Sequence, residues 1–174
     1  MHGGFSGERP RYQAGRVTEG EMPILGYRLV RLIEAHAEGL AKALGEQIAI
    51  SDRCHDYRTK VDPKELEHLV GEVYQQLGQW LLSRTESDIE QRYRAIGARR
   101  AQEGVPLSQV LWCIALVKEN LWEYFSANDL LQQPAEVFGE MKMFQLLDQF
   151  IDRAMYYAAV GYENNMAFRM GKNS

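Results

Sequence analysis

The sequence predicts an all-α protein, and three features of the chain support this fold class. Apolar residues recur at steps of three and four over most of the length, which is the spacing of one helix face. Pro63, Pro106 and Pro134 stand where the first turn of a helix accepts proline. No segment alternates apolar and polar residues between hairpin turns. We therefore predict a single domain of about five principal helices.

Length and composition exclude several classes of protein. The 174 residues suffice for one domain with a sizeable core. Apolar residues make up 45% and charged residues 25%, as in soluble globular proteins, and the net charge of -4 argues against broad nucleic-acid binding. No apolar run approaches the roughly 20 residues that span a bilayer, so we expect no membrane insertion. Cys54 and Cys113 are too few for a disulfide framework and favour a reducing cytoplasm.

The first predicted helix opens the helical domain, which we expect over residues 22–165. A flexible, glycine-rich tail is expected over 1–21 and a polar tail over 166–174. The helix begins near Ile24, and the inward face that its spacing predicts includes His36. The other residues of this face are apolar: Leu25, Leu29, Leu32, Leu40, Leu44 and Ile48. A polar connector follows, with room for one short turn.

Two further helices have recognisable ends. Asp62 and Pro63 predict the start of the second, because an aspartate oxygen accepts from free N–H groups there and proline lacks one. The third begins near Thr85 or Ser87 and ends at Gly104. The inner face of the second comprises Leu66, Leu69, Val70, Val73, Tyr74, Leu77, Trp80 and Leu81, and that of the third comprises Ile89, Tyr93, Ile96 and Arg100.

The last two predicted helices each open at a proline. The fourth opens at Pro106 and continues to Ala127, with Cys113 near its apolar face as a predicted core residue. Its apolar positions are Leu107, Val110, Leu111, Ile114, Val117, Leu121, Trp122 and Phe125. Pro134 opens the last helix, which is long because helical spacing continues as far as Tyr162.

The corner between the third and fourth helices carries a family resemblance. The segment from Ile96 to Leu107 is similar to the I-G-x-x-H-x-x-x-G-x-P string of haem-binding sensor globins. The histidine of that string holds the iron, and Arg100 stands in its place here. The resemblance implies a single globin-like helical domain that has lost its haem ligand.

A second family resembles more of the chain. Residues 93–108 resemble the N-terminal domain of the RsbT co-antagonist proteins, which are sensory components of the bacterial stressosome. Tyr57-Arg58, Glu65-Leu66 and the segment from Phe150 to Tyr157 agree with that family, and the resemblance extends over residues 24–163. It implies a bacterial stress-response input domain, globin-like, dimeric and without haem, commonly joined to an output module. No such module follows here, which leaves open a stand-alone regulator or a piece of a longer protein.

Arg100 is the foremost candidate site residue, because the helical spacing turns its guanidinium inward and a buried charge is costly unless it is paired. One interpretation is that its stem packs inside while its head reaches water or pairs with a carboxylate. A second is that it anchors an anion or another ligand in the pocket vacated by haem. A third is a boundary shift of one residue, which leaves Arg99 or Arg100 exposed.

The other pocket candidates are His36, Tyr93, Ile96 and Trp112. His36 is either a hydrogen-bonded core residue or an alternative haem ligand, and the aromatic residues either line a cavity or fill the core. Glu65-x-x-His68 has the spacing of a di-iron helix but lacks the second copy that such sites need. His55 beside Cys54 is a weak signal for a metal or haem contact. No catalytic motif is present, so we expect no enzyme and no metal.

The last helix is apolar around more of its circumference than one core requires. Such a helix usually buries two faces. We therefore predict that Met155, Tyr156, Tyr157 and Tyr162 form a dimer seam, which packs with the fourth helix into an intermolecular four-helix bundle.

Three hypotheses of function follow. The first is a non-catalytic regulatory sensor domain for signal transduction: a homodimer without cofactor that binds a regulatory protein and a small apolar or anionic ligand. In this hypothesis a signal biases the long last helix. The second is a sensor globin that binds haem or another tetrapyrrole through His36, His55 or another residue. The third is a structural adaptor with a filled core.

Overall fold

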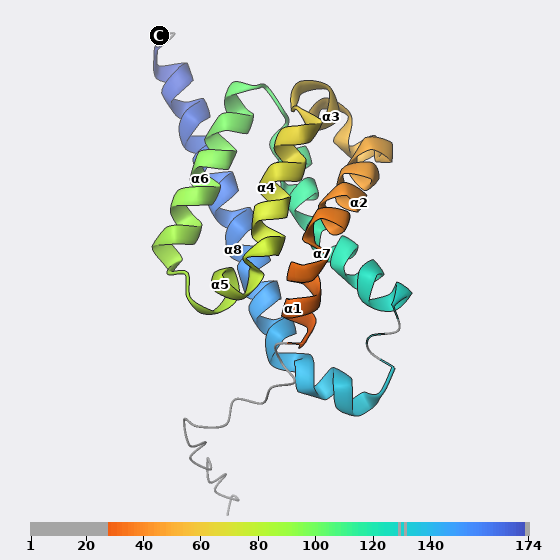
Figure 1. Cartoon of the computed structure of the whole chain (residues 1–174). Coiled ribbons are helices and arrows are strands. Elements are labelled where there is room, and N and C mark those ends of the chain that lie inside the picture. The colour runs from red at the N-terminus through yellow and green to blue at the C-terminus, as the bar shows by residue number, and fades with distance from the viewer. Residues whose placement is uncertain (1–27, 129, 131, 173–174) are drawn as a thin grey trace, which may run out of the picture.

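The computed structural model describes residues 28–128, 130 and 132–172, and these residues contain eight α-helices, one 3-10 turn and no strand (Figure 1). The prediction of an all-α fold with a long last helix is confirmed. The tail predicted over 1–21 lies outside the described residues. Among the described residues, no helix is long and apolar enough to cross a membrane. The elements are α1 (Arg28–Ala35), α2 (Ala37–Ile50), η2 (Asp52–Cys54), α3 (His55–Lys60), α4 (Pro63–Gln75), α5 (Leu77–Leu82), α6 (Glu86–Gln102), α7 (Leu107–Ala127) and α8 (Pro134–Lys172).

The first two predicted helices are each broken once. The backbone of His36 has φ -112° and ψ 18°, and that of Gln76 has φ -117° and ψ 25°, which is the sparsely populated bridge region between helix and strand. The bends let α1 pack against both α4 and α5. Neither position holds glycine or proline, and the apolar spacing runs on across both, so the sequence contained no local signal for the breaks.

The predicted helix ends are confirmed where the sequence carried a specific cap. The Asp62 carboxylate accepts from the backbone N–H of Lys64 at 3.0 Å, with Pro63 as the first residue of α4. The Thr85 hydroxyl accepts from the N–H of Asp88, whose carboxylate accepts in return from the N–H of Thr85. Gly104 has φ +72°, the left-handed conformation that ends a helix.

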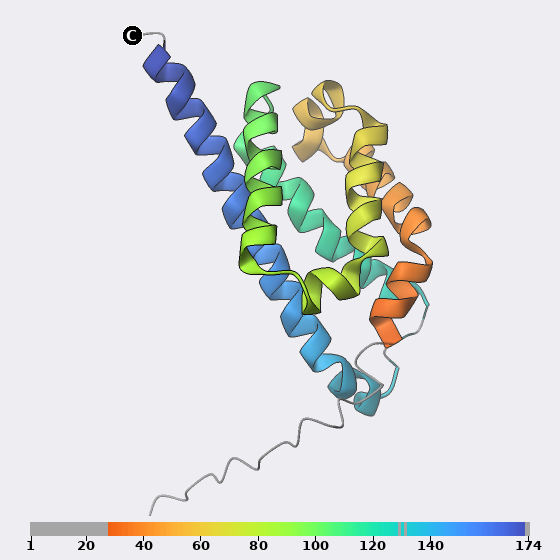
Figure 2. The ribbon, with the colours of Figure 1, turned by 60° about the vertical axis from the view of Figure 1, so that its left-hand side comes forward.

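The closest packing in the molecule joins α6 to α8, which lie side by side in Figures 1 and 2. A Cβ atom on Gly97 would lie 1.9 Å from the carbonyl oxygen of Ala158, and one on Gly161 would lie 2.1 Å from the carbonyl oxygen of Arg94. Both distances are far inside van der Waals contact. Two glycines, one on each helix, thus allow the two backbones to touch.

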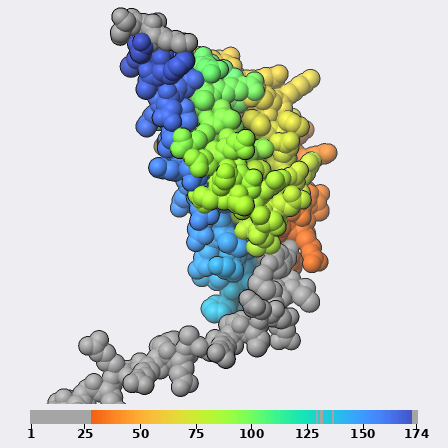
Figure 3. Space-filling view, turned by 90° about the vertical axis from the view of Figure 1, so that its left-hand side faces the viewer, coloured from red at the N-terminus to blue at the C-terminus, as the bar shows by residue number. Residues whose placement is uncertain are grey.

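Helix α8 is the longest element of the fold. Its 39 residues extend over roughly 58 Å at 1.5 Å per residue. Figure 3 shows it along one side of the molecule beside α6, and Figure 2 shows its C-terminal end beyond the other helices. The polar segment predicted over 166–174 continues this helix as far as Lys172. A movement of α8 would therefore displace a helix end that projects from the domain.

Candidate functional site

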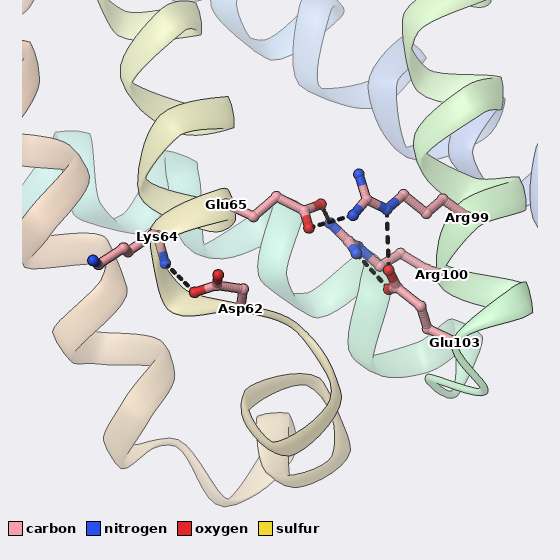
Figure 4. A network of polar contacts seen from close by, with 6 residues as sticks. All are labelled: Asp62, Lys64, Glu65, Arg99, Arg100 and Glu103. Atoms are coloured by element: carbon pink, nitrogen blue, oxygen red, sulfur yellow. Dashed lines mark hydrogen bonds and ion pairs between the residues drawn. The ribbon is translucent and has the colours of Figure 1, made fainter.

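Arg100 lies near the end of α6 with a side chain that is 1% exposed, so the interpretation as a boundary error does not apply to it. Its Nη2 donates to Oε1 of Glu65 at 2.6 Å, and its Nη1 donates to Oε2 of Glu103. Figure 4 shows Glu65 extending from α4 toward the arginines of α6. The guanidinium is therefore paired with one carboxylate from another helix and one from the end of its own.

Arg99 binds the same two carboxylates from outside. Its Nη2 donates to Oε2 of Glu65 at 2.6 Å, and its Nε donates to Oε1 of Glu103 at 3.1 Å. Its side chain is 58% exposed, in contrast to that of Arg100. We call these four residues the Arg100 network. Each carboxylate accepts from one buried and one exposed arginine. The network contains two arginines and two carboxylates, so its formal charges cancel.

The Arg100 guanidinium also contacts the ring of Tyr57 from α3, with 5.4 Å between Cζ and the ring centroid. Burial lowers the pKa of Arg100, but its interactions with Tyr57, Glu103 and Glu65 outweigh this effect and raise the pKa above its ordinary value. Burial disfavours the charged form of Tyr57 as well, and for this acid it raises the pKa, to about 12. At neutral pH the pair is a cation against a neutral ring. The buried Nε of Arg100 has no hydrogen-bond partner.

An apolar cavity of about 70 Å³ lies among α4, α6, α7 and α8. Tyr93 and Ile96, two of the predicted pocket residues, line it together with Cys113 and Phe150. The lining cation is Arg92, whose guanidinium donates to the Glu72 carboxylate at 3.1 Å and to the carbonyl of Leu69. Tyr57 forms part of the cavity wall as well, so the cavity and the Arg100 network share a side chain.

The remaining predicted pocket residues lie elsewhere. The prediction that His36 lies in the core is wrong: the bend between α1 and α2 leaves its ring exposed, with Nδ1 2.8 Å from the carbonyl of Leu32 and 3.1 Å from the hydroxyl of Tyr124. Trp112 is half-buried under the guanidinium of Arg53, which lies 4.2 Å from its ring centroid. In the part of the chain that the structure describes, no three metal-ligating side chains converge.

The predicted dimer seam is mostly engaged within the chain. The Tyr157 hydroxyl donates to Glu86 at 2.7 Å, and the Tyr162 hydroxyl donates to the carbonyl of Val105 at 2.8 Å. Met155 is half-buried against the core, whereas Tyr156 is 63% exposed. The tyrosine hydroxyls on α8 thus hold α8 to α6 and to the corner that follows it.

Exposed apolar residues also lie at the junction of α7 and α8. Phe138 is 81% exposed, and the exposed fractions of Trp122, Val137 and Met141 are 44%, 36% and 48%. The ring of Trp122 stacks on that of Phe144 with 4.9 Å between centroids. We call Trp122, Val137, Phe138 and Met141 the α7–α8 apolar cluster. The sequence counted Trp122 among the apolar positions of the fourth helix, and only the packing of α7 on α8 shows that Trp122 is 44% exposed.

Three comparisons with known proteins complete these observations. A family model described as the RsbT co-antagonist protein rsbRD N-terminal domain matches residues 34–167, a range that contains both the Arg100 network and the cavity. Comparison with curated proteins and comparison with solved structures gave no match. The globin-like character that the sequence resemblance implies therefore stays a prediction.

Proposed function

Because the chain belongs to the family of RsbT co-antagonist N-terminal domains, we propose that it is a non-catalytic sensor domain that acts as a homodimer without haem. The family suggests a regulatory, stressosome-related role exerted through protein–protein contacts. In this role the domain lies in the cytoplasm of a bacterium and passes a stress signal to a regulatory protein. The observation that carries the proposed mode of action is the α7–α8 apolar cluster.

A second copy of the chain is the occupant that this cluster favours. Single exposed apolar residues are ordinary, but a contiguous group of them marks an interaction surface. A two-fold dimer uses the same patch on both subunits, and two neighbouring helices from each chain would form the four-helix arrangement that buries such patches. Tyr156 lies farther along the same helix and would extend the contact.

The signal would reach the surface through α8. This helix borders the cavity with Phe150 and Ile151, touches the backbone of α6 at Gly161 and continues to the projecting end of the domain. Because the backbones of α6 and α8 touch, no layer of side chains lies between them that could adjust when one helix moves. A small displacement at the cavity would therefore move α8 as a rigid body relative to its dimer partner.

The cavity favours a small apolar ligand over an anion. Its lining is apolar except for Arg92 and the tyrosine hydroxyls, and Arg92 is already bound to Glu72. The Arg100 guanidinium is likewise bound to Glu65 and Glu103. An anion would have to displace one of these carboxylates, whereas an apolar molecule would fill space without breaking an ion pair.

We expect the purified chain to be a dimer at micromolar concentration, with twice the 20.0 kDa mass of one chain in light scattering. Phe138→Glu should give a folded monomer, because a dimer would bury the new carboxylate unpaired. Ile50→Glu is the matched control, since Ile50 is equally exposed at 81% but lies at the end of α2. A wild-type chain that is monomeric at this concentration contradicts the dimer.

The residues at the expected haem site do not fit haem. An arginine has no lone pair to offer an iron. The cavity of about 70 Å³ is also much smaller than the pockets of about 300–1,000 Å³ that hold drug-sized ligands. We therefore expect no sharp Soret band when haem is added to the apo-protein. Exposed His36 and His55 both lie outside the cavity lining, so we expect no band from either. A sharp band that Arg100→His strengthens would instead support the haem-binding alternative.

A further inference from the structure

Two buried thiols meet between η2 and α7. The Sγ atoms of Cys54 and Cys113 are 3.5 Å apart, although 59 positions separate the residues in sequence. Both residues are free and buried, with Cys54 fully enclosed and Cys113 5% exposed. The proposed sensor function gives neither thiol a chemical role, although Cys113 lines the cavity. Their proximity arises from the docking of α3 on α7, where the Gln109 side chain accepts from the N–H of Tyr57 and donates to the Asp56 carboxylate.

The separation is within reach of a covalent bond. A disulfide has an S–S length of about 2.05 Å, so the two sulfurs must approach by about 1.5 Å. Cys54 is the last residue of a single 3-10 turn between α2 and α3, and such a turn can shift more easily than the middle of α7. Rotation of the two side chains and a small displacement of η2 would together close the gap.

The cavity gives an oxidant a place beside one of the thiols. Cys113 lines the cavity, whose volume of about 70 Å³ exceeds the share of about 30 Å³ that one water molecule takes in the liquid. Hydrogen peroxide has two oxygen atoms and fits this space. Cys54 does not line the cavity, and its sulfur reaches the cavity only through the neighbouring sulfur of Cys113 at 3.5 Å. The arrangement thus gives the two thiols different roles: Cys113 is oxidised first, and Cys54 then attacks the oxidised sulfur of Cys113.

We propose that Cys54 and Cys113 form a reversible intramolecular disulfide when a peroxide oxidises the domain. The Cys113 sulfur attacks one oxygen of hydrogen peroxide, the O–O bond breaks, and the thiol proton leaves with the other oxygen as water. The Cys54 sulfur then attacks the Cys113 sulfenic acid, the S–O bond breaks, and a second water leaves. The two sulfurs are oxidised by two electrons in total, and the peroxide is reduced.

The reaction should be slow for a thiol. Burial, and after it the neighbouring Cys54, raise the pKa of Cys113, while Arg100 lowers it by a smaller amount. Little thiolate is therefore present at neutral pH, and the site would respond to sustained rather than brief peroxide exposure. In a reducing cytoplasm such a disulfide would be transient, as redox-sensing disulfides are.

Oxidation would act on the structures that the proposed signal uses. Cys54 directly precedes α3, whose Tyr57 contacts both the cavity and Arg100. A bond to Cys113 would fasten this segment to α7 and restrict movement of Tyr57 in the cavity wall. The cross-link would also restrict the unfolded chain over the loop from α3 to α7, so the melting temperature should rise by about 5–10 °C.

The test is a thiol count on the full chain after incubation of the folded protein with millimolar hydrogen peroxide. We expect the denatured product to show no free thiol, a peptide map to show Cys54 linked to Cys113, and dithiothreitol to restore both thiols and the original melting temperature. Cys54→Ala and Cys113→Ala are the matched controls, which should show neither the linked peptide nor the rise in melting temperature.

Three outcomes would overturn the proposal. The first is a wild-type chain that keeps both thiols after prolonged exposure, and the second is stable oxygen adducts on Cys113 with Cys54 still free. The third is a disulfide between two chains instead of within one. The peptide map distinguishes all three from the expected product and from oxidised methionine. The expected disulfide lies within one chain, so its formation does not depend on whether the domain dimerises or binds a regulatory protein.

Discussion

Gly97→Ala should destabilise the domain by at least about 3 kcal/mol, or prevent it from folding. The new Cβ would lie 1.9 Å from the carbonyl oxygen of Ala158, and it would also lie within 3.0 Å of two further backbone atoms of that residue. A backbone cannot rotate away as a side chain can, so α6 and α8 would have to separate. This separation would open the core along their whole contact. Urea denaturation followed by circular dichroism measures the free energy of unfolding.

Two other glycines make the comparison specific. Gly161→Ala places a Cβ 2.1 Å from the carbonyl oxygen of Arg94 on the opposite helix, and we expect a loss of similar size. Gly39→Ala is the control, because nothing lies within 4 Å of the added atom. Alanine in a helix is favoured over glycine by about 0.5–1 kcal/mol, so this variant should be as stable as the wild type or slightly more so. Equal stability of all three variants would contradict the backbone contact.

Arg100→Leu should lower the free energy of unfolding by about 2–3 kcal/mol. Removing one partner of a buried ion pair typically costs about 3–5 kcal/mol, because the other charge stays buried. We expect less here, since Glu65 and Glu103 are 19% and 24% exposed and each retains Arg99. The leucine also leaves unfilled part of the space that the arginine occupied. Thermal and urea unfolding at neutral pH provide the measurement.

Arg99→Leu is the matched control, because Arg99 binds the same two carboxylates from solvent. Exposed ion pairs contribute about 0.2–1 kcal/mol, so this variant should lose much less stability than Arg100→Leu. High salt should reduce the small effect of Arg99→Leu and leave most of the effect of Arg100→Leu, since buried pairs are screened less. If Arg100→Leu is as stable as the wild type, the buried pairing does not support the fold.

Several features were predictable because they depend on residues close in sequence. The caps at Asp62 and Thr85 use side chains within three residues of the backbone N–H groups that they bind, and the stop at Gly104 depends on the backbone conformation of that residue alone. The inward position of Arg100 followed from its place four residues after Ile96 and seven after Tyr93. The buried state of Cys113 followed in the same way from its position near an apolar face.

The sequence by itself determined the helical class, most helix ends and the presence of a charge on an inner face, because each follows from local hydrogen bonding and helical periodicity. Only the tertiary structure decided which carboxylates neutralise Arg100, that Cys54 meets Cys113, and that Gly97 touches Ala158. It also decided the bend that exposes His36. Each of these depends on which helices become neighbours. That choice is made by the packing of the whole core, and no short stretch of residues encodes it.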